Sequence, residues 1–294
     1  MRNANKMKQE IAMEECKYGF ATEETIRVRK SIRTYEGRPL SSEDKKKMVS
    51  FIEQSSNPFE QKLQIRLIQT NAAAKGEKLG TYGVIKGASE FIGVTVKNSA
   101  TALEAVGYQV EQLILYATSL GLGTCWLGGT FQRGSFASAM NIKEDEILPI
   151  ISPIGYPAEK KRTSEKLMLM LGQSANRAEF SEHFFDGHFH MPLTKATAGD
   201  FFLPLEMVRL APSAMNKQPW RIIKNGNRID FYLQEGIMSK TSPVKLSKVD
   251  IGIAACHFDL MRKEMGISGQ FRIDEGSADL SERKLKYEFS FFAE

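Results

Sequence analysis

The strongest constraint on the fold is an internal repeat between two apolar helical segments. Residues 106–123 (VGYQVEQLILYATSLGLG) align without a gap with residues 251–268 (IGIAACHFDLMRKEMGIS). The alignment pairs Gly107 with Gly252, Leu113 with Phe258, Gly121 with Gly266, and Leu122 with Ile267. The strand-like segment QIRLIQT (64–70) likewise parallels PWRIIKN (219–225). Two amphipathic helices can resemble each other by chance, but the shared order of elements around them favours duplication.

The length of the chain agrees with two repeats. Its 294 residues correspond to two domains of about 150 residues each. Periodicity is lost over 178–199, which we expect to cross the surface between the halves. We therefore divide the chain at residues 1–180 and 181–294 and expect the halves to pack as one compact unit.

Hydrophobic periodicity predicts an α+β fold in which a central, antiparallel-type sheet is flanked by helices. In the first half we expect a helix capped by Ser41, strands at 64–70 and 90–97, a helix at 101–120, and a strand at 147–154. In the second half we expect a helix at 201–211, strands at 221–223 and 228–233 joined by Asn225-Gly226, and a helix at 249–265. A terminal strand should carry on one face Leu285, Tyr287, Phe289 and Phe291.

Charge and cysteine content narrow the class of function. The 40 Lys and Arg residues are interleaved with 35 Asp and Glu residues, which favours neither a nucleic acid nor a membrane as partner. Three cysteines without a C-x-x-C motif argue against a disulfide framework and a zinc ribbon. The charged N-terminal segment has no apolar core of a signal peptide. We expect a soluble, cytoplasmic protein.

The segment RKSIR, before the first predicted helix, is a candidate anion site. In an extended backbone, Arg29, Ser31 and Arg33 lie on one side, Ile32 faces the core, and Lys30 points away from the other polar groups. Two guanidinium groups and a hydroxyl are the donors that a phosphate dianion prefers. A solvated basic patch in front of a helix is the alternative.

A second polar cluster, APSAMNKQPW (211–220), follows the predicted helix of the second half. Pro212 ends that helix, and Pro219 should hold Gln218 extended. Between the prolines, a hydroxyl, two amides and a lysine crowd a short loop, which suits a heteroaromatic ligand with donors and acceptors. An ordinary Asx-rich turn is the alternative, and Trp220 by itself is typical of a core.

These segments resemble the signature motifs of the FMN-dependent nitroreductase family. Two further motifs match, LGLGTCWLGG (120–129) and IGYPAEKKR (154–162), and the four motifs stand in the family's order over about 24–162 and 201–269. The resemblance implies a nitroreductase-like α+β fold that binds FMN. It further implies that NADH or NADPH delivers hydride to the flavin, which then reduces a small nitroaromatic or quinone-type acceptor in a ping-pong cycle.

The two halves depart from the family in complementary ways. An ordinary member carries both signatures on a half-length chain and forms its flavin sites between two copies. Here the first half reads QSSNPFEQKLQIRLI (54–68) where the second signature belongs, and the second half reads LTKATAGDF (193–201) without paired arginines. The chain thus resembles a fused dimer, an intramolecular pseudo-dimer with one complete site that needs no partner subunit.

The resemblance implies cofactor-binding roles for residues of both halves. At the phosphate and ribityl end it places the first motif, Arg29, Lys30, Ser31 and Arg33, together with Lys161 or Arg162. Across the flavin it places Pro212, Ser213, Ala214 and Asn216. Beside the ring it places Trp126, Leu127, Gly128 and Gly129, with Thr81 or Tyr82 near the pyrimidine edge. No side chain is assigned as catalytic, because the flavin carries the redox chemistry.

Other readings are weaker. The glycines of 121–126 lack the third position of a dinucleotide fingerprint and follow a helix. Four residues could ligate a metal, His183, Asp186, His188 and His190, but a surface linker explains them better, and we expect no metal. Cys125 with His257 lacks an orienting third group for nucleophilic catalysis. The main alternative function is that of a flavin carrier or sensor without catalytic turnover. A third candidate function is that of the dehalogenating or flavin-degrading relatives of the family.

Overall fold

The structure is a computed structural model, and it describes residues 19–70, 79–159, 176–234, 244–274, 276 and 284–294. Lys161 and Arg162 lie outside this part of the chain. Within it, no helix is both long and apolar enough to cross a membrane.

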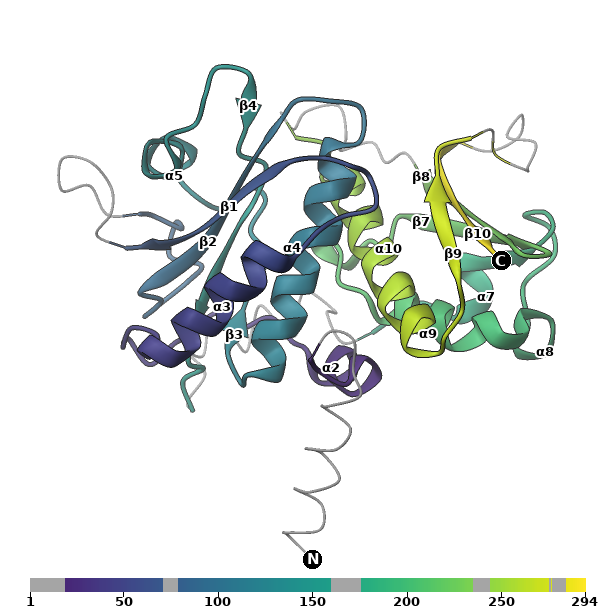
Figure 1. Ribbon diagram of the computed structural model, residues 1–294, viewed down its shortest axis with the longest axis horizontal. Helices are drawn as coiled ribbons and strands as arrows, with labels where there is room; N and C mark the ends of the chain where they lie inside the picture. The colour runs from purple at the N-terminus through teal and green to yellow at the C-terminus, as the bar shows by residue number, and fades with distance from the viewer. Residues whose placement is uncertain (1–18, 71–78, 160–175, 235–243, 275, 277–283) are drawn as a thin grey trace, which may run out of the picture.

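Each half of the chain builds its own five-stranded sheet (Figure 1). The first contains β1 (Leu63–Gln69), β2 (Glu90–Lys97), β3 (Gly123–Thr124), β4 (Glu146–Ile147) and β5 (Ile151–Gly155). The second contains β6 (Phe184–Asp186), β7 (Trp220–Asn225), β8 (Arg228–Gln234), β9 (Gly269–Arg272) and β10 (Leu285–Ala293). The expectation of a single central sheet is wrong, because the duplicated strands pair only within their own half.

The same strand order occurs in both halves. The first sheet runs β1-β2-β5-β3 and the second β7-β8-β10-β9, with antiparallel pairs throughout both series. Two strands lie outside this common pattern: β4 pairs with β2, and β6 pairs in parallel with β7. The predicted α+β fold of two diverged repeats is confirmed.

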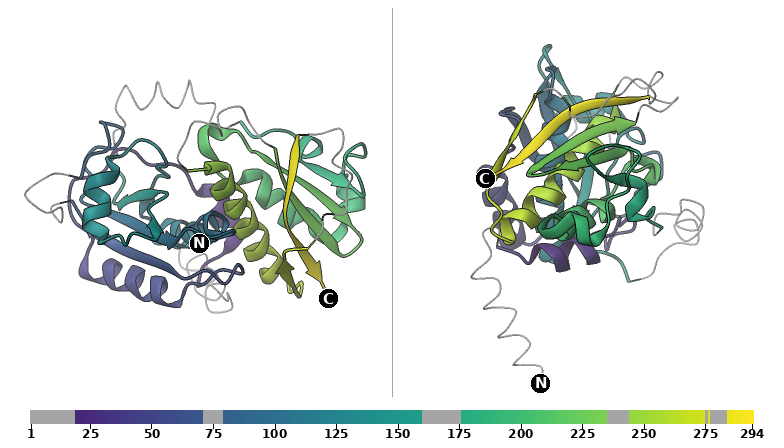
Figure 2. Two further views of the ribbon diagram at one scale, coloured as in Figure 1. Left: turned by 90° about the horizontal axis from the view of Figure 1, so that it is seen from above. Right: turned by 90° about the vertical axis from the view of Figure 1, so that its right-hand side faces the viewer.

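Helices surround and separate the sheets. The longer ones are α2 (Thr22–Val28), α3 (Ser42–Gln54), α4 (Ala102–Ser119), α5 (Arg133–Met140), α9 (Phe202–Leu210) and α10 (Leu246–Glu264). The short ones are α7 (Phe180–His183), α8 (Lys195–Ala198), η2 (Gly199–Phe201) and η3 (Ala214–Asn216). The predicted cap of α3 is present, since Ser41 Oγ accepts the Asp44 amide hydrogen at 3.0 Å. Seen from above, α4 and α10 run between the two sheets (Figure 2).

The two central helices touch through their backbones. A Cβ atom on Gly107 would lie 2.0 Å from the carbonyl oxygen of Val249, and one on Gly252 would lie 2.1 Å from that of Glu104. The two glycines are the pair matched by the sequence repeat. Such a reciprocal contact is what an approximate two-fold axis between two halves produces.

One hydrophobic core joins the halves around this contact. Val106, Val110 and Ile114 of α4 are fully buried in the same cluster as Phe258 of α10 and Phe289 of β10. Both helices are buried on nearly all sides, as expected for helices enclosed between two layers.

A β-bulge changes the predicted face of the last strand. Tyr287 lies opposite Tyr232, but Phe289 lies opposite Phe231, so Glu288 is an extra residue in β10. Side chains on the two sides of a bulge no longer alternate in phase. Leu285 and Tyr287 therefore pack on one side of the sheet, whereas Phe289 and Phe291 enter the central core. The prediction that all four share one face is wrong.

The segment between the halves is more ordered than its composition suggests. It forms α7 and β6, and Phe184, Phe185 and His183 are buried. The expectation of an irregular surface crossing is wrong here because β6 extends the second sheet by parallel pairing with β7.

Burial and the nearby Arg221 lower the pKa of His183 to about 4. No group of His, Cys, Asp and Glu in the described residues is arranged to hold a metal.

The helix crossing generates a stability prediction. Gly107→Ala and Gly252→Ala should each lower the free energy of unfolding by about 1–3 kcal/mol or more, because the new methyl group meets backbone that cannot rotate away. Gly134→Ala in α5 is the matched control: its Cβ would have no neighbour within 4 Å, and the change should be neutral or stabilising. Urea denaturation measures all three. Equal effects would show that the crossing is not tight.

Candidate functional site

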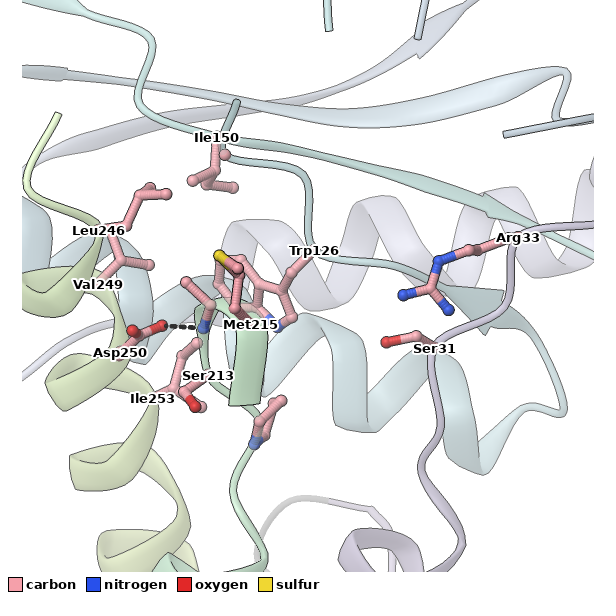
Figure 3. A pocket seen from close by; sticks show the side chains of 13 residues that line it. Ser31, Arg33, Trp126, Ile150, Ser213, Met215, Leu246, Val249, Asp250 and Ile253 are labelled. Atoms are coloured by element: carbon pink, nitrogen blue, oxygen red, sulfur yellow. Dashed lines mark hydrogen bonds between the residues drawn. The ribbon is translucent and has the colours of Figure 1, made fainter. Parts of the chain in front are cut away.

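A cavity opens where the two halves meet, beside the first turns of α10 (Figure 3). It contains about 600 Å³ of atom-free space, part of it open to solvent. The first half contributes Ser31, Arg33, Trp126, Gly128 and Ile150. The second half contributes Pro212, Ser213, Ala214, Met215, Leu246, Val249, Asp250 and Ile253. The cavity thus brings together parts of both sequence motifs.

The RKSIR segment is extended, as its alternation predicted. Ser31 forms a bridge with Thr124 of β3, and the Ile32 amide donates to the Thr124 carbonyl oxygen at 2.8 Å. Ile32 is buried and Lys30 is exposed. The side chains of Ser31 and Arg33 both reach toward the cavity (Figure 3).

Guanidinium nitrogens of this segment are buried without partners. Arg29 Nε and Arg33 Nη1 have no hydrogen-bond acceptor among the residues that the structure describes. A buried charged donor left unpaired is costly, so such groups normally bind an anion or a carboxylate. The donor set therefore fits the phosphate group of a ligand that enters the cavity.

Arg177 adds a third guanidinium group that sequence reasoning missed. It lies between the halves, donates from Nη1 to Asn216 Oδ1 at 2.7 Å, and also contacts the Leu210 carbonyl oxygen. Burial, followed by the like charges of Arg29 and Arg209, lowers its pKa to about 10. Its proximity to Arg29 depends on the three-dimensional fold, and Arg177 lies outside the four family motifs of the sequence.

The 211–218 loop holds an unusual backbone. Met215, Asn216 and Gln218 have φ values of 53°, 55° and 47°, each of which costs a non-glycine residue about 1–3 kcal/mol. The expectation of an extended Gln218 is wrong; its amide instead donates to Ser213 Oγ at 2.8 Å. Strain of this kind persists only where surrounding contacts fix it, and it is concentrated at functional sites.

Trp126 is held by a buried polar chain that connects the halves. Its indole N–H donates to Glu111 Oε2 at 2.8 Å, and Glu111 Oε1 lies 2.9 Å from His257 Nε2. His257 Nδ1 faces the Met207 carbonyl oxygen at 2.9 Å and therefore carries a proton. Glu111 and His257 are fully buried. The sequence signal for Glu111 is an acidic residue within an apolar helical stripe.

Asp250 is the other acidic group that the sequence analysis overlooked. Its Oδ1 accepts the Ala214 amide hydrogen at 2.9 Å, which fixes the loop against α10. Burial raises its pKa to about 7, although the Ala214 amide and the positive charge of Lys217 act in the opposite direction. Burial thus favours the neutral form of a carboxyl group that lines the cavity.

The remaining predicted residues lie around the cavity or outside it. Leu127 is buried and pairs with Ile151 through the backbone. Asn216 binds Arg177 and the Asn176 carbonyl oxygen instead of lining the cavity. Five other predicted residues do not line the cavity: Arg29, Lys30, Thr81, Tyr82 and Gly129. Their proposed contacts with a flavin stay predictions, as do those of Lys161 and Arg162.

In the first half, the loop equivalent to 211–218 places an aromatic side chain where the second half has the cavity. The matched strands place Glu60 at the position of Met215, and both residues have positive φ, 56° and 53°. The preceding residue, Ala214 in the cavity, corresponds to Phe59. The Phe59 ring is buried against Phe289, with the ring centroids 5.0 Å apart. One of two equivalent loops therefore borders a cavity, whereas the other inserts an aromatic ring into the core.

Comparison with solved structures identifies the fold class. A "putative nitroreductase" from Thermotoga maritima is 20% identical, with coverage of 92% of each chain and a TM-score of 0.57. A nitroreductase with bound FMN from Bacteroides fragilis is also 20% identical. The match covers 48% of this chain and 93% of the Bacteroides fragilis chain, with a TM-score of 0.39. A "putative NADH dehydrogenase/NAD(P)H nitroreductase" from Parabacteroides distasonis is 21% identical, covering 48% and 89%, with a TM-score of 0.39. The fold is that of a nitroreductase.

The family assignment rests on the sequence as a whole. The model of the family described as "Putative TM nitroreductase" matches residues 21–262. The chain therefore belongs to this nitroreductase family, whose members are oxidoreductases, and the predicted resemblance is confirmed. No curated protein matches the chain.

The geometry of RKSIR predicts unequal roles for its basic residues. Arg33→Ala should weaken FMN binding by about 1.5–3 kcal/mol, roughly ten- to a hundredfold, because it removes a buried charged donor. Lys30→Ala is the matched control and should have much less effect, since Lys30 is exposed on the opposite side. Flavin fluorescence titration measures both affinities. Equal losses would indicate a diffuse basic patch.

Proposed function

We propose that the protein is an FMN-dependent NAD(P)H oxidoreductase that reduces nitroaromatic or quinone-type acceptors. The observation that carries this proposal is the pair of buried guanidinium nitrogens of Arg29 and Arg33 that have no partner among the described residues. Arg33 lines the cavity between the two halves, and Arg29 belongs to the same RKSIR segment. An anion-binding end next to a partly apolar cavity suits a phosphorylated flavin better than a neutral ligand. Family membership supports the same assignment.

Bound FMN would supply the redox chemistry, accepting hydride from the nicotinamide and passing it to the acceptor. The chain's own residues bind, orient and shield. Arg29, Ser31 and Arg33 would hold the phosphate and ribityl end. Ile150, Val249 and Ile253 give part of the cavity wall an apolar surface. The Glu111 carboxyl group fixes the edge of Trp126, so that this wall stays in place when a planar ring enters.

The first test identifies the cofactor and the reaction. The purified protein should be yellow and release FMN on denaturation, and its flavin should bleach anaerobically with NADH or NADPH and reoxidise with a nitroaromatic or quinone. Absorption spectroscopy and chromatography of the released flavin measure this. Protein that is colourless and ignores added FMN would contradict the proposal. FMN that binds but is not reduced would favour the alternative, a silent flavin carrier or sensor.

We also infer one FMN per chain, bound without a partner subunit. Each half retains one signature, and Phe59 is buried at the position equivalent to Ala214. The helix contact that a half-length relative would make between subunits is internal to this fold.

Flavin-to-protein stoichiometry, measured beside the light-scattering mass, tests this inference. We expect a ratio of one, unchanged when dilution dissociates any larger species. Two flavins per chain would mean that the loop around Phe59 opens to form a second site. Flavin loss in step with dissociation would place the site between chains instead.

A further inference from the structure

Asp250 combines burial with an unfinished hydrogen-bond set. It is 5% exposed, it lines the cavity, and its single hydrogen bond runs from the Ala214 amide to Oδ1 (Figure 3). In the described part of the chain, Oδ2 has no hydrogen-bond partner. Val249 and Ile253, its neighbours on α10, give this side of the cavity an apolar surface. An ionised carboxylate is costly in such surroundings, whereas a neutral carboxyl group is not.

The proton location follows from the hydrogen-bond geometry. Oδ1 accepts from a backbone amide, so a protonated Asp250 carries its hydrogen on Oδ2. That O–H group is then a donor beside the cavity and needs an acceptor. An oxygen of a bound ligand can provide it.

We propose that Asp250 is a catalytic acid that donates its Oδ2 proton to an oxygen of the electron acceptor. The inference rests on the proposed function, since it concerns an acceptor reduced by hydride in this cavity. The substrate class is an organic acceptor whose carbonyl or nitro oxygen gains a proton on reduction. Quinones meet this requirement.

The step balances for a quinone. The hydride equivalent that the reduced cofactor would supply forms an O–H bond at one carbonyl oxygen of the quinone and brings two electrons. The ring becomes aromatic and its electrons move onto the other carbonyl oxygen, which takes the proton as the O–H bond of Asp250 breaks. The product is the hydroquinone, and the Asp250 carboxylate regains a proton from water. A positioned acid typically accelerates such a transfer by about 10²–10⁴-fold.

Several charges surround Asp250 and set its titration. Lys217 on the loop and the hydrogen bond from the Ala214 amide favour the carboxylate. Lys248, two residues before Asp250 on α10, is joined to Glu104 at 2.5 Å and to Glu288 at 3.3 Å. Burial outweighs the positive charges and holds the pKa of Asp250 near 7. The acid form therefore dominates below about pH 7 and is lost as the pH rises through it.

The first experiment needs no flavin. Infrared difference spectra between the wild-type apoprotein and Asp250→Asn should contain the C=O band of a protonated carboxyl group at pH 6, which fades as the pH rises through about 7. The amide keeps an oxygen that accepts the Ala214 hydrogen, so the loop anchor is retained. Asp145→Asn, which changes an exposed carboxylate, is the matched control and should remove no such band. Absence of the band from wild type at pH 6 would overturn the proposal.

The second experiment compares two acceptors on the holoenzyme. Benzoquinone needs a proton for reduction, whereas ferricyanide takes an electron and no proton. Asp250→Asn should lower the ratio of the benzoquinone rate to the ferricyanide rate by about 10²-fold. It should also abolish the fall in this ratio as the pH rises through about 7. A ratio that is unchanged by the substitution would show that Asp250 only anchors the loop.

The two experiments test the acid role of Asp250 and the oxidoreductase function independently. A protein that binds no FMN but shows the infrared band would refute the oxidoreductase assignment while leaving the neutral carboxyl group established. A protein that reduces both acceptors with an unchanged ratio would support the oxidoreductase assignment and refute the role of Asp250. If Asp250→Asn fails to fold, pH titration of the wild-type acceptor ratio still decides: a ratio independent of pH between 6 and 8 would contradict the acid.

Discussion

The backbone contact between α4 and α10 determines what the rest of the structure can do. At Gly107 and Gly252 no side chain separates the helices, so their backbones approach too closely to admit a Cβ atom. Each half alone has an incomplete site: the first carries Ser31 and Arg33, and the second carries Asp250. Because the contact is internal to one chain, the site forms with the fold, without the entropy loss of association.

Because both halves belong to one chain, the two equivalent loops can differ. In a symmetric homodimer every substitution appears at both equivalent sites, so a ring such as Phe59 would close both. In the fused chain, Phe59 adds to the aromatic core while Ala214 keeps the cavity open. The closed position gains buried apolar surface, worth roughly 25 cal/mol per Å². Stability and ligand binding can therefore be improved in different halves.

Features governed by local chemistry were predictable from sequence, whereas those set by distant partners were not. Ser41 caps its helix and the β7–β8 hairpin turns at Gly226, because both signals act within a few residues. The bulge at Glu288 could not be read from alternation, since it depends on the register with β8. The roles of Arg177 and Asp250 could not be predicted, because they depend on the positions of these residues beside the cavity and its loop in the folded chain.

The strained loop connects the two ends of the site. Asp250 anchors Ala214 at the cavity, and Arg177 anchors Asn216 beside Arg29. Repulsion from Arg29 is one of the causes that lower the pKa of Arg177, so an anion bound between these two cations would offset that repulsion. Arg177 would then couple an anion bound beside Arg29 to the loop that it holds through Asn216.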